Sequence, residues 1–303
     1  MNCDREDIMD KIVRIGTRSS RLAVIQAEEL AFYIRRQCPG IQPELVMIET
    51  TGDRRQDVML DKIGGKGLFV KEIDKALLSG EIDLAVHSLK DMPVEESYKI
   101  PIVSFSRRED ARDALILPEG RREWNGCGII GCSSFRRRIQ AEKLFPGAEF
   151  RAIRGNVITR LEKLDRGEYD ALILAAAGLR RLGLERRIFR YFSPEEMLPA
   201  AGQGILAIQG RAKTDYSFLK GFDTFESAMA AKAERAFVKC LDGGCSSPVA
   251  AYAEVAGDIL WLKGLYYREK DYFFAVGSKS GSAAYAEQIG VSLAQELKDR
   301  YNV

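Results

Sequence analysis

Histidine is almost absent from this sequence, and its scarcity excludes several kinds of chemistry. His87 is the single histidine among 303 residues. Zinc sites that need several histidines, such as HExxH, are therefore excluded, and we expect no metal. A Ser-His-Asp or Cys-His nucleophile would have to use His87 itself. The chemistry must come mainly from arginine, lysine, carboxylates, hydroxyls or thiols.

Long hydrophobic runs are also missing. No apolar stretch approaches the roughly 20 residues of a membrane-spanning helix, so no membrane partner is expected. Residues 1–10 contain four acidic residues and no hydrophobic core, which argues against a secretory signal. The six cysteines form no CxxC pair, which disfavours zinc ribbons and thioredoxin-like sites. We therefore expect a cytoplasmic protein with free thiols.

The chain has little net charge, but its charged residues are unevenly distributed. The net charge is +2, yet residues 107–190 hold 17 Arg and 2 Lys against 12 acidic residues. That segment carries +7, and the other 219 residues carry −5. An arginine-rich middle segment indicates binding of an anion such as a phosphate, a nucleic acid or a carboxylate. A solvated, salt-bridged surface is the alternative, and composition alone does not decide between the two.

The order of the expected elements predicts the fold class. The expected strands are 11–15, 44–48, 83–87, 114–117, 128–131, 149–153 and 171–175, and the expected helices are 20–36, 68–78, 135–145 and 157–165. This alternation predicts two α/β domains with mixed, largely parallel sheets. Residues 204–209 are typical of a strand that returns to the first domain.

The last third of the chain has a different pattern. A capping box at residues 223–226, with Asp223 first, predicts the start of a helix. The apolar face expected for this helix is Phe225, Met229, Ala233, Ala236 and Cys240. Three strands (249–253, 259–265 and 273–276) and a helix with Ala286, Ile289, Leu293 and Leu297 complete a small α+β domain. The expected domains are residues 1–106 with 198–222, residues 107–197, and residues 223–303.

Arginine recurs where an expected strand turns into a helix, at residues 16–20, 131–137, 153–156 and 177–181. In open α/β sheets, ligands bind beyond the carboxyl ends of the strands. Ser or Asn at such a turn caps the next helix, whose free N–H groups favour an anion, and a guanidinium adds a bidentate partner. One such turn is ordinary capping beside a surface arginine, whereas four favour a cleft lined for a polyanion.

Lys90 and Asp91 follow the expected strand 83–87 and reach the same edge as the arginines. Among these cations Asp91 should be ionised, and it could stabilise a cationic intermediate or move a proton. The alternative is a salt-bridged turn. His87 lies within the strand and is expected to be a packed, hydrogen-bonded side chain.

Two glycine-rich stretches have more than one interpretation. Gly243 and Gly244 allow a sharp bend that exposes Cys245, which is either a covalent attachment point or an incidental thiol. The glycine-rich loop at 64–67 lacks the GxxxxGK[ST] pattern of a phosphate-binding loop. A lid that carries Lys62 and Lys66 over the cleft is the expectation there.

Taken together, ten stretches resemble the porphobilinogen deaminase family, also called the hydroxymethylbilane synthases. They are GTRSS (16–20), TTGD (50–53), GGKGLFVKE (64–72), DLAVHSLKDMP (83–93), REDARDAL (108–115), GCSSFRRR (131–138), RGNVITRL (154–161), LAAAGLRRLGL (174–184), LPAAGQG (198–204) and GGCSSPVAAYA (243–253). They follow the family's order along the chain. The resemblance implies two domains similar to those of periplasmic binding proteins and a small third domain.

The resemblance also implies a transferase activity. The family condenses four porphobilinogen molecules head to tail, releases ammonia, and frees the linear tetrapyrrole by hydrolysis. It uses a dipyrromethane cofactor that is thioether-linked to a cysteine, and the matching position is Cys245. The position that matches its catalytic aspartate is Asp91. The family is usually monomeric.

Further roles follow from the resemblance, residue by residue. Cofactor binding is implied for Lys90, Arg136, Arg137, Ser133 and Ser134. Substrate binding is implied for Arg18, Ser19, Ser20, Arg154, Arg160, Arg181 and Phe69, and lid contacts for Lys62 and Lys66. Bidentate arginines suit the acetate and propionate of each porphobilinogen. Arg21, Cys132 and Ser246 depart from the family pattern, but none of the departures removes a key charge or the thiol.

Two other classes of function compete with this interpretation. A two-lobed protein that binds or senses a solute would explain the arginines, but it needs neither Asp91 nor Cys245. A nucleic-acid binder would use the basic middle segment. The sequence has no basic tail and no aromatic-interleaved RNA motif, so no nucleic-acid partner is expected.

Overall fold

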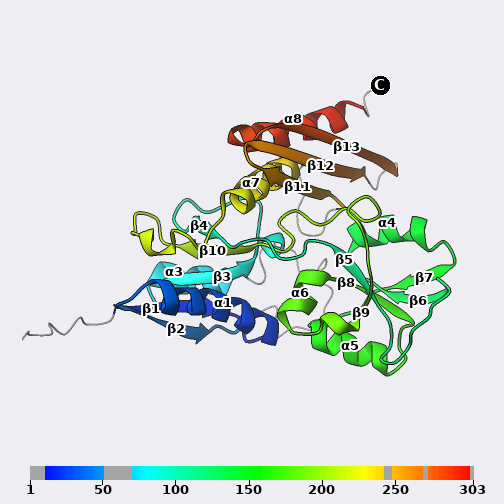
Figure 1. The fold of residues 1–303 in the computed structure, drawn as a ribbon, viewed down its shortest axis with the longest axis horizontal. Coiled ribbons are helices and arrows are strands. Elements are labelled where there is room, and N and C mark those ends of the chain that lie inside the picture. The colour runs from blue at the N-terminus through cyan, green and yellow to red at the C-terminus, as the bar shows by residue number, and fades with distance from the viewer. Residues whose placement is uncertain (1–10, 51–69, 242–247, 269–271, 301–303) are drawn as a thin grey trace, which may run out of the picture.

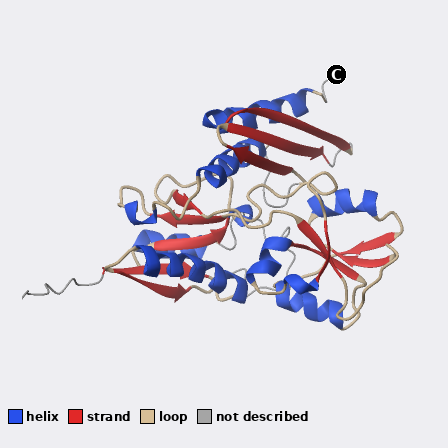
Figure 2. Cartoon of the chain, in the orientation of Figure 1, coloured by secondary structure: helices blue, strands red, loops and turns tan. Residues whose placement is uncertain are grey.

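The computed structural model describes residues 11–50, 70–241, 248–268 and 272–300. These residues form two five-stranded sheets and one three-stranded sheet. Figure 1 shows the sheets as three separate groups of strands, with the smallest group above the other two. Figure 2 shows that helices flank the strands of each group.

The first sheet combines early and late parts of the chain, in the order β2-β1-β3-β10-β4. Its strands are β1 (Lys11–Thr17), β2 (Ile41–Met47), β3 (Leu84–Ser88), β4 (Ile102–Phe105) and β10 (Leu206–Gly210), with helices α1 (Arg21–Gln37) and α3 (Lys71–Ser79) and the 3-10 turns η2 (Leu89–Asp91) and η4 (Ser217–Leu219). β1 pairs in parallel with β2 and β3, whereas β10 is antiparallel to β3 and β4. The predicted return of residues 204–209 to this domain is therefore confirmed.

The second sheet repeats the same arrangement in the order β7-β6-β8-β5-β9. Its strands are β5 (Asp113–Ile116), β6 (Gly128–Gly131), β7 (Ala148–Arg151), β8 (Ala171–Ala175) and β9 (Ile188–Tyr191), with α4 (Phe135–Leu144), α5 (Val157–Asp165), α6 (Ala176–Arg181) and η3 (Glu185–Arg187). β6 is parallel to β7 and β8, and β5 is antiparallel to β8 and β9. The predicted mixed, largely parallel α/β sheets are confirmed.

The chain passes between the two large sheets twice, first from β4 to β5 and then from β9 to β10. In each sheet the antiparallel strand is the one that the chain enters after a crossing. Gly202, in the second crossing, has a φ of +74°. A Cβ there would lie 2.6 Å from Leu89 Cγ, so glycine is required both by the backbone and by the space.

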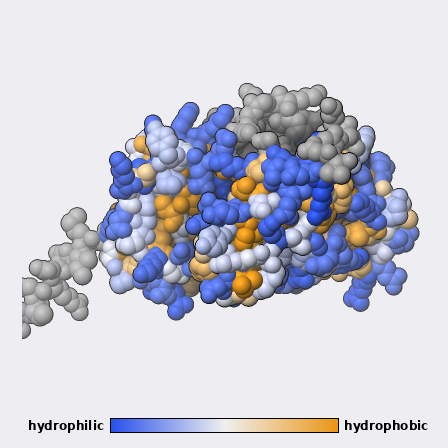
Figure 3. Space-filling view, turned by 90° about the horizontal axis from the view of Figure 1, so that it is seen from above, coloured by the Kyte–Doolittle hydropathy of each residue, from blue (hydrophilic) through white to orange (hydrophobic). Residues whose placement is uncertain are grey.

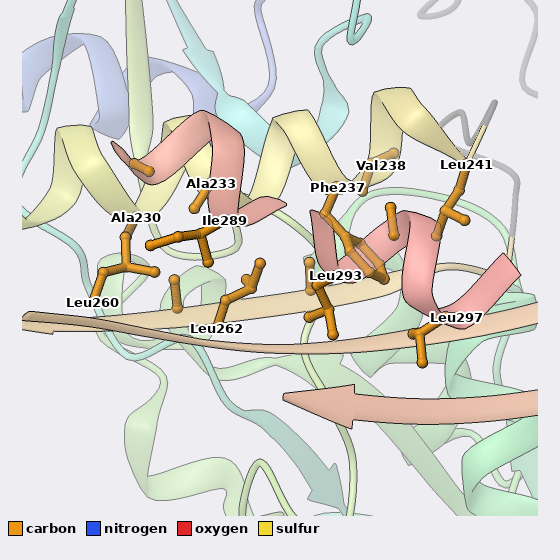
Figure 4. Packing of buried hydrophobic residues seen from close by; sticks show 14 of the residues in the cluster. Ala230, Ala233, Phe237, Val238, Leu241, Leu260, Leu262, Ile289, Leu293 and Leu297 are labelled. Atoms are coloured by element: carbon orange, nitrogen blue, oxygen red, sulfur yellow. The ribbon is translucent and has the colours of Figure 1, made fainter. Parts of the chain in front are cut away.

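The third group is a small antiparallel sheet, β11 (Ala250–Ala256), β12 (Ile259–Arg268) and β13 (Phe273–Ser282), with α7 (Phe225–Cys240), η5 (Ala283–Tyr285) and α8 (Ala286–Asp299). Figure 4 shows Phe237 of α7 and Leu293 of α8 packed over Leu262 of β12. A Cβ on Gly290 would lie 2.3 Å from the Ala233 carbonyl oxygen, so glycine lets the two helices approach. The predicted α+β domain is confirmed.

Two predicted details of α7 are wrong. Its N-cap is Thr224, whose hydroxyl accepts a hydrogen bond from the Ser227 N–H, and not Asp223. Phe225, placed on the apolar face by the sequence, is half exposed, whereas Phe237 is fully buried. The reason is that α7 is covered on two sides, by the small sheet and by the first domain (Figure 1), so a single apolar stripe does not describe it.

The sequence also missed two strands, β4 and β9. Each has four residues and lies at the edge of its sheet, so neither shows a clear alternation of buried and exposed positions.

The face of the molecule in Figure 3 is largely hydrophilic and carries only small hydrophobic patches. In the described ranges, no helix combines the length and apolar character needed to cross a bilayer.

Candidate active site

A large cleft opens beyond the carboxyl ends of parallel strands from both five-stranded sheets. Arg18 follows β1, Leu89 follows β3 and Cys132 follows β6, and all three line it. The cleft has a volume of about 1780 Å³. Pockets for single small molecules usually measure roughly 300–1,000 Å³. The size therefore suits a ligand made of several linked units.

Three helices begin at the wall of this cleft, as predicted. Ser20, Ser134 and Asn156 are the N-caps of α1, α4 and α5, and each side chain accepts a hydrogen bond from a backbone N–H of its own helix. All three caps line the cleft. The remaining N–H groups of a helix N-terminus and the helix dipole favour an anion there.

The fourth predicted turn, residues 177–181, is wrong in detail. These residues lie inside the short helix α6, whose N-cap is Ala175 and has no capping side chain. Arg181 is therefore in the last helical turn rather than at a strand-to-helix junction. It still lines the cleft, where Nη2 donates to the Gly204 carbonyl at 3.1 Å and Nε to Glu29 at 3.1 Å.

Positive charge dominates the cleft wall. The basic lining residues are Arg18, Arg21, Lys90, Arg136, Arg137, Arg138, Arg154, Arg160, Arg181 and Arg235. Among the described lining residues, the carboxylates are Asp91 and Glu49. The composition of the wall matches a ligand that carries several negative charges.

The structure brings together every predicted site residue that it describes. Twelve line this one cleft: Arg18, Ser19, Ser20, Lys90, Asp91, Ser133, Ser134, Arg136, Arg137, Arg154, Arg160 and Arg181. Lys62, Lys66, Phe69 and Cys245 lie outside the described residues. Pro248, three positions after Cys245 in the sequence, lines the cleft.

Asp91 stands at the end of the short turn η2 and is exposed to the cleft. Its neighbours Leu89 and Met92 are buried, and the Leu89 N–H donates to the Ile205 carbonyl at 3.0 Å. Burial lowers the pKa of Lys90 to about 8, and Arg137 acts in the same direction while Asp91 opposes it. The turn thus presents a carboxylate and a lysine whose charge changes near neutral pH.

Sequence reasoning missed the residue that organises Arg136 and Arg137. Asp113, at the start of β5, is completely buried between them. Arg136 Nη1 donates to Asp113 Oδ2 at 2.7 Å, Arg137 Nε donates to Oδ1 at 2.9 Å, and Gln203 donates to Oδ1 at 3.0 Å. Burial alone would raise the pKa of Asp113, but the two guanidiniums hold it well below its usual range.

Part of the hydrogen-bonding capacity of Arg136 and Arg137 is therefore used inside the protein. Arg136 also donates to the Leu198 carbonyl at 2.7 Å, and Arg137 to the Ile173 carbonyl at 3.2 Å. A guanidinium has five N–H donors, so these bonds orient each group without using all of its donors. The REDARDAL stretch contains Asp113, but nothing local in the sequence shows that it faces two arginines.

Ser133 and Arg160 also have internal partners. The Ser133 hydroxyl donates to the Ile153 carbonyl at 2.5 Å and accepts from the Ile153 N–H at 2.8 Å. It thereby joins the loop after β6 to the loop after β7. Arg160 Nε donates to the Gly155 carbonyl at 2.8 Å. These bonds fix the loops that carry the arginines of the second domain.

His87 and Cys132 are buried. His87 pairs with Ala207 across β3 and β10, and burial lowers the pKa of its imidazole to about 4. The predicted packed histidine is confirmed, although its Nε2 has no hydrogen-bond partner among the described residues. Burial raises the pKa of the Cys132 thiol, which disfavours the reactive thiolate. Neither group adds a nucleophile to the cleft.

Comparison with known proteins decides the family. Residues 13–218 match the family model "Porphobilinogen deaminase, dipyromethane cofactor binding domain", and residues 228–299 match the model of the C-terminal domain. The chain belongs to the porphobilinogen deaminase family. It is 51% identical to the porphobilinogen deaminase of Acetivibrio thermocellus over 94% of this chain and 97% of that protein. It is 51% identical to that of Ruminiclostridium cellulolyticum over 95% and 98%.

Solved structures of lower similarity come from another group of proteins. Substrate-binding domain 2 of Lactococcus lactis GlnP has a TM-score of 0.42 and 12% identity, with 70% of this chain and 87% of that chain covered. A substrate-binding domain of an amino acid ABC transporter from Streptococcus pneumoniae has a TM-score of 0.44 and 14% identity, with 74% and 96% covered.

The cleft fits the cofactor named by the family model. A dipyrromethane built from porphobilinogen carries two acetates and two propionates, and the described wall offers ten basic side chains and three helix N-termini to carboxylates. Pyrrole N–H groups need acceptors, and Asp91 provides one at the wall. No group of three or more His, Cys, Asp and Glu among the described residues is arranged to hold a metal ion.

Proposed function

We propose that this chain condenses four porphobilinogen molecules head to tail and releases the linear tetrapyrrole by hydrolysis. Each condensation breaks one C–N bond, releases ammonia and forms one C–C bond. The proposed primer is a dipyrromethane bound through a thioether to Cys245, which supplies a free pyrrole α-carbon as the carbon nucleophile. The observation that carries the proposal is the large cationic cleft with Asp91 on a fixed turn at its wall.

The proposed role of Asp91 follows from the charge around it. Loss of ammonia from porphobilinogen leaves positive charge on the pyrrole and its methylene carbon. A carboxylate at the wall stabilises that charge and accepts hydrogen bonds from pyrrole N–H groups. The same carboxylate can assist the removal of the proton from the attacking α-carbon. No histidine is required for these steps.

The arginines and helix N-termini supply the proposed binding of the carboxylates. Arg18, Arg154, Arg160 and Arg181 come from four different loops or helices around the cleft. A growing chain gains two carboxylates with every added unit, so a wall with basic groups on both domains can hold successive units. We propose cofactor contacts for Lys90, Ser133, Ser134, Arg136 and Arg137, and substrate contacts for Arg18, Ser19, Ser20, Arg154, Arg160, Arg181 and Phe69.

The division into residues 1–106 with 198–222, 107–197 and 223–303 is proposed for the domains. The proposal is supported by the three sheets and the two crossings. A monomeric protein located in the cytoplasm is also proposed, as the family resemblance implies. Analytical ultracentrifugation tests the first of these two statements and cell fractionation the second.

Replacement of Cys245 by alanine tests the covalent cofactor. Intact-protein mass spectrometry of the wild type should show the chain with an adduct of two pyrrole units, and Cys245→Ala should lack it and be inactive. Cys127→Ala is the matched control because Cys127 is an exposed thiol outside the cleft lining. An active wild type without an adduct would rule out the covalent primer, and an inactive, unmodified wild type would favour a solute-binding protein.

Substitution of Arg154 by lysine should impair elongation. Lysine keeps the charge but replaces a planar bidentate fork by a point charge. We expect incompletely elongated pyrrole chains to accumulate on the protein. They would be visible as a changed distribution of adduct masses during turnover. Arg166→Lys is the control, because Arg166 is exposed and pairs with Glu168 away from the cleft. An unchanged distribution in Arg154→Lys would contradict the role of Arg154.

The pH dependence of turnover should reflect Lys90, for which we propose a contact with the cofactor. Its pKa of about 8 means that the positive charge is present below this pH and is lost above it. Because this charge is proposed to hold a carboxylate of the cofactor and so to position the attacking pyrrole, kcat should fall as the pH passes about 8. Lys90→Arg keeps its charge to much higher pH, so the fall should move upward. A kcat profile identical in the two proteins would show that Lys90 does not cause it.

A further inference from the structure

Arg235, in the middle of α7, reaches the segment that follows the Asp91 turn. Its Nη2 donates to the Pro93 carbonyl at 2.8 Å, to the Val94 carbonyl at 3.0 Å and to Glu96 at 3.2 Å. The Arg235 side chain is only 11% exposed. Because two of these acceptors are main-chain oxygens, the guanidinium fixes the path of the backbone directly after Asp91.

Apolar residues of the same segment also pack in one cluster with α7. Leu89 is the first residue of the turn and Met92 follows it, and both are buried in a cluster that includes Ala231 of α7. Ala231 lies one helical turn before Arg235, so the two residues share a face of the helix. α7 is therefore linked to the Asp91 segment in two ways, through the apolar cluster at the turn and through hydrogen bonds to the residues that follow it.

α7 is itself anchored next to Arg235. Glu234 is completely buried, and its carboxylate accepts two hydrogen bonds from Arg108 Nη2, at 2.7 and 2.8 Å. It also accepts from the backbone N–H groups of Gly202 at 2.6 Å and Ala253 at 2.7 Å. Arg108 and Gly202 belong to the two crossings between the large sheets. Glu234 thus ties α7 to both crossings and to β11.

We propose that Arg235 is a positioning residue that holds the Asp91 turn at a fixed place relative to α7. The proposal rests on the proposed function, because it assigns Asp91 the catalytic role. It gives α7 a specific part in the reaction. The helix that leads towards Cys245 along the chain also sets the position of the carboxylate that acts on the bound pyrroles. Arg235 acts through Asp91 and not by binding a substrate carboxylate, although it lines the cleft.

Arg235→Met tests this role because methionine keeps an aliphatic stem of similar length and removes the guanidinium. The variant should retain the dipyrromethane adduct by mass spectrometry and should lose about 10²-fold in kcat, the order expected for a displacement near 1 Å. KM for porphobilinogen should change little. A residue that bound substrate carboxylates would instead raise KM, and an unchanged kcat with a raised KM would overturn the proposal.

Combination with Asp91→Asn supplies the decisive comparison. If Arg235 acts through the Asp91 carboxylate, then Arg235→Met should cost little further rate in a chain that already carries Asp91→Asn. Single-turnover measurements with porphobilinogen give both rates. If the two losses multiply, Arg235 acts independently of Asp91, and the proposal is wrong.

Arg211→Met is a control for the loss of an arginine that donates to two main-chain carbonyls, although the Arg211 side chain is 30% exposed. Arg211 Nη1 donates to the Leu77 and Ile82 carbonyls at 3.0 and 2.6 Å, and Nη2 donates to Asp83 at 2.9 Å. Arg211 does not line the cleft. Its loss should lower the melting temperature and leave kcat of the folded protein unchanged. A fall in kcat equal to that of Arg235→Met would show a merely structural effect.

Arg235→Lys keeps the proposal testable if Arg235→Met does not fold. Both carbonyls accept from the same nitrogen, Nη2. The ammonium of lysine ends one bond short of that position but keeps the positive charge, so kcat should fall less than in Arg235→Met and KM should stay constant. Wild-type kcat in Arg235→Lys would overturn the proposal. The proposed function fails separately, because it requires that the wild type itself carries the adduct and consumes porphobilinogen.

Discussion

Asp91→Asn should fold normally and turn over porphobilinogen about 10²–10⁴-fold more slowly than the wild type, the range attributed to a positioned acid or base. The amide is nearly isosteric with the carboxylate, so the buried neighbours Leu89 and Met92 should keep the turn in place. What is lost is the negative charge opposite the cation that forms when ammonia leaves. The rate of tetrapyrrole formation in holoenzyme measures the effect.

The size of this loss depends on the surroundings of Asp91. The described cleft wall carries ten basic side chains and two carboxylates, Asp91 and Glu49, so loss of the Asp91 charge removes half of the described negative charge at the wall. Glu95→Gln serves as a control because Glu95 is exposed, lies four residues away and does not line the cleft. It should turn over at the wild-type rate. A turnover of Asp91→Asn within a few-fold of the wild type would contradict the assigned role.

Asp113→Asn should lower the free energy of unfolding by about 3–5 kcal/mol, the cost of removing one partner from a buried ion pair. Asp113 is inaccessible to solvent, and the side chains of Arg136 and Arg137 are 5% and 9% exposed. Without the carboxylate, two guanidiniums stay buried beside each other with no negative charge between them. Urea denaturation followed by circular dichroism measures the change.

Asp110→Asn is the control for this stability effect. Asp110 is close in sequence and also binds an arginine, but its partner Arg112 is 42% exposed, so the expected loss is about 1 kcal/mol or less. An equal loss in both variants would contradict the special weight of the buried cluster.

The free energy of unfolding measured as a function of pH is a second test of the Asp113 cluster. Because the pKa of Asp113 is lower in the folded chain, its contribution is complete above about pH 4 and is lost progressively as the pH falls from there through the lower pKa of the folded chain.

The sequence predicted the helices and strands best where the signal is local. α5 and β8 have the predicted bounds, and the caps Ser20, Ser134 and Asn156 are as expected. A cap depends on one side chain and the backbone within three residues. The edge strands β4 and β9 were not predicted because they depend on pairing with β10 and β5, which come from distant segments of the chain.

The same contrast between local signals and long-range contacts applies to the residues of the site. The arginines of the cleft could be located from the turns that follow strands, because parallel strands end at a common edge. Asp113 could not be assigned, since its partners lie 23 and 24 residues away on a helix. Arg235 was likewise missed, because its contacts with Pro93 and Val94 span more than 140 residues.

What the sequence by itself determined was the fold class, the family resemblance and a set of residues that meet at one cleft. Those features depend on periodicity, helix caps and ordered motifs, which are properties of short segments. Only the tertiary structure decided which cations are held by Asp113, and that α7 carries the links between Asp91 and the crossings of the chain. The physical reason is that the strength of a charge or hydrogen bond depends on burial and on partners, and both arise when distant segments pack together.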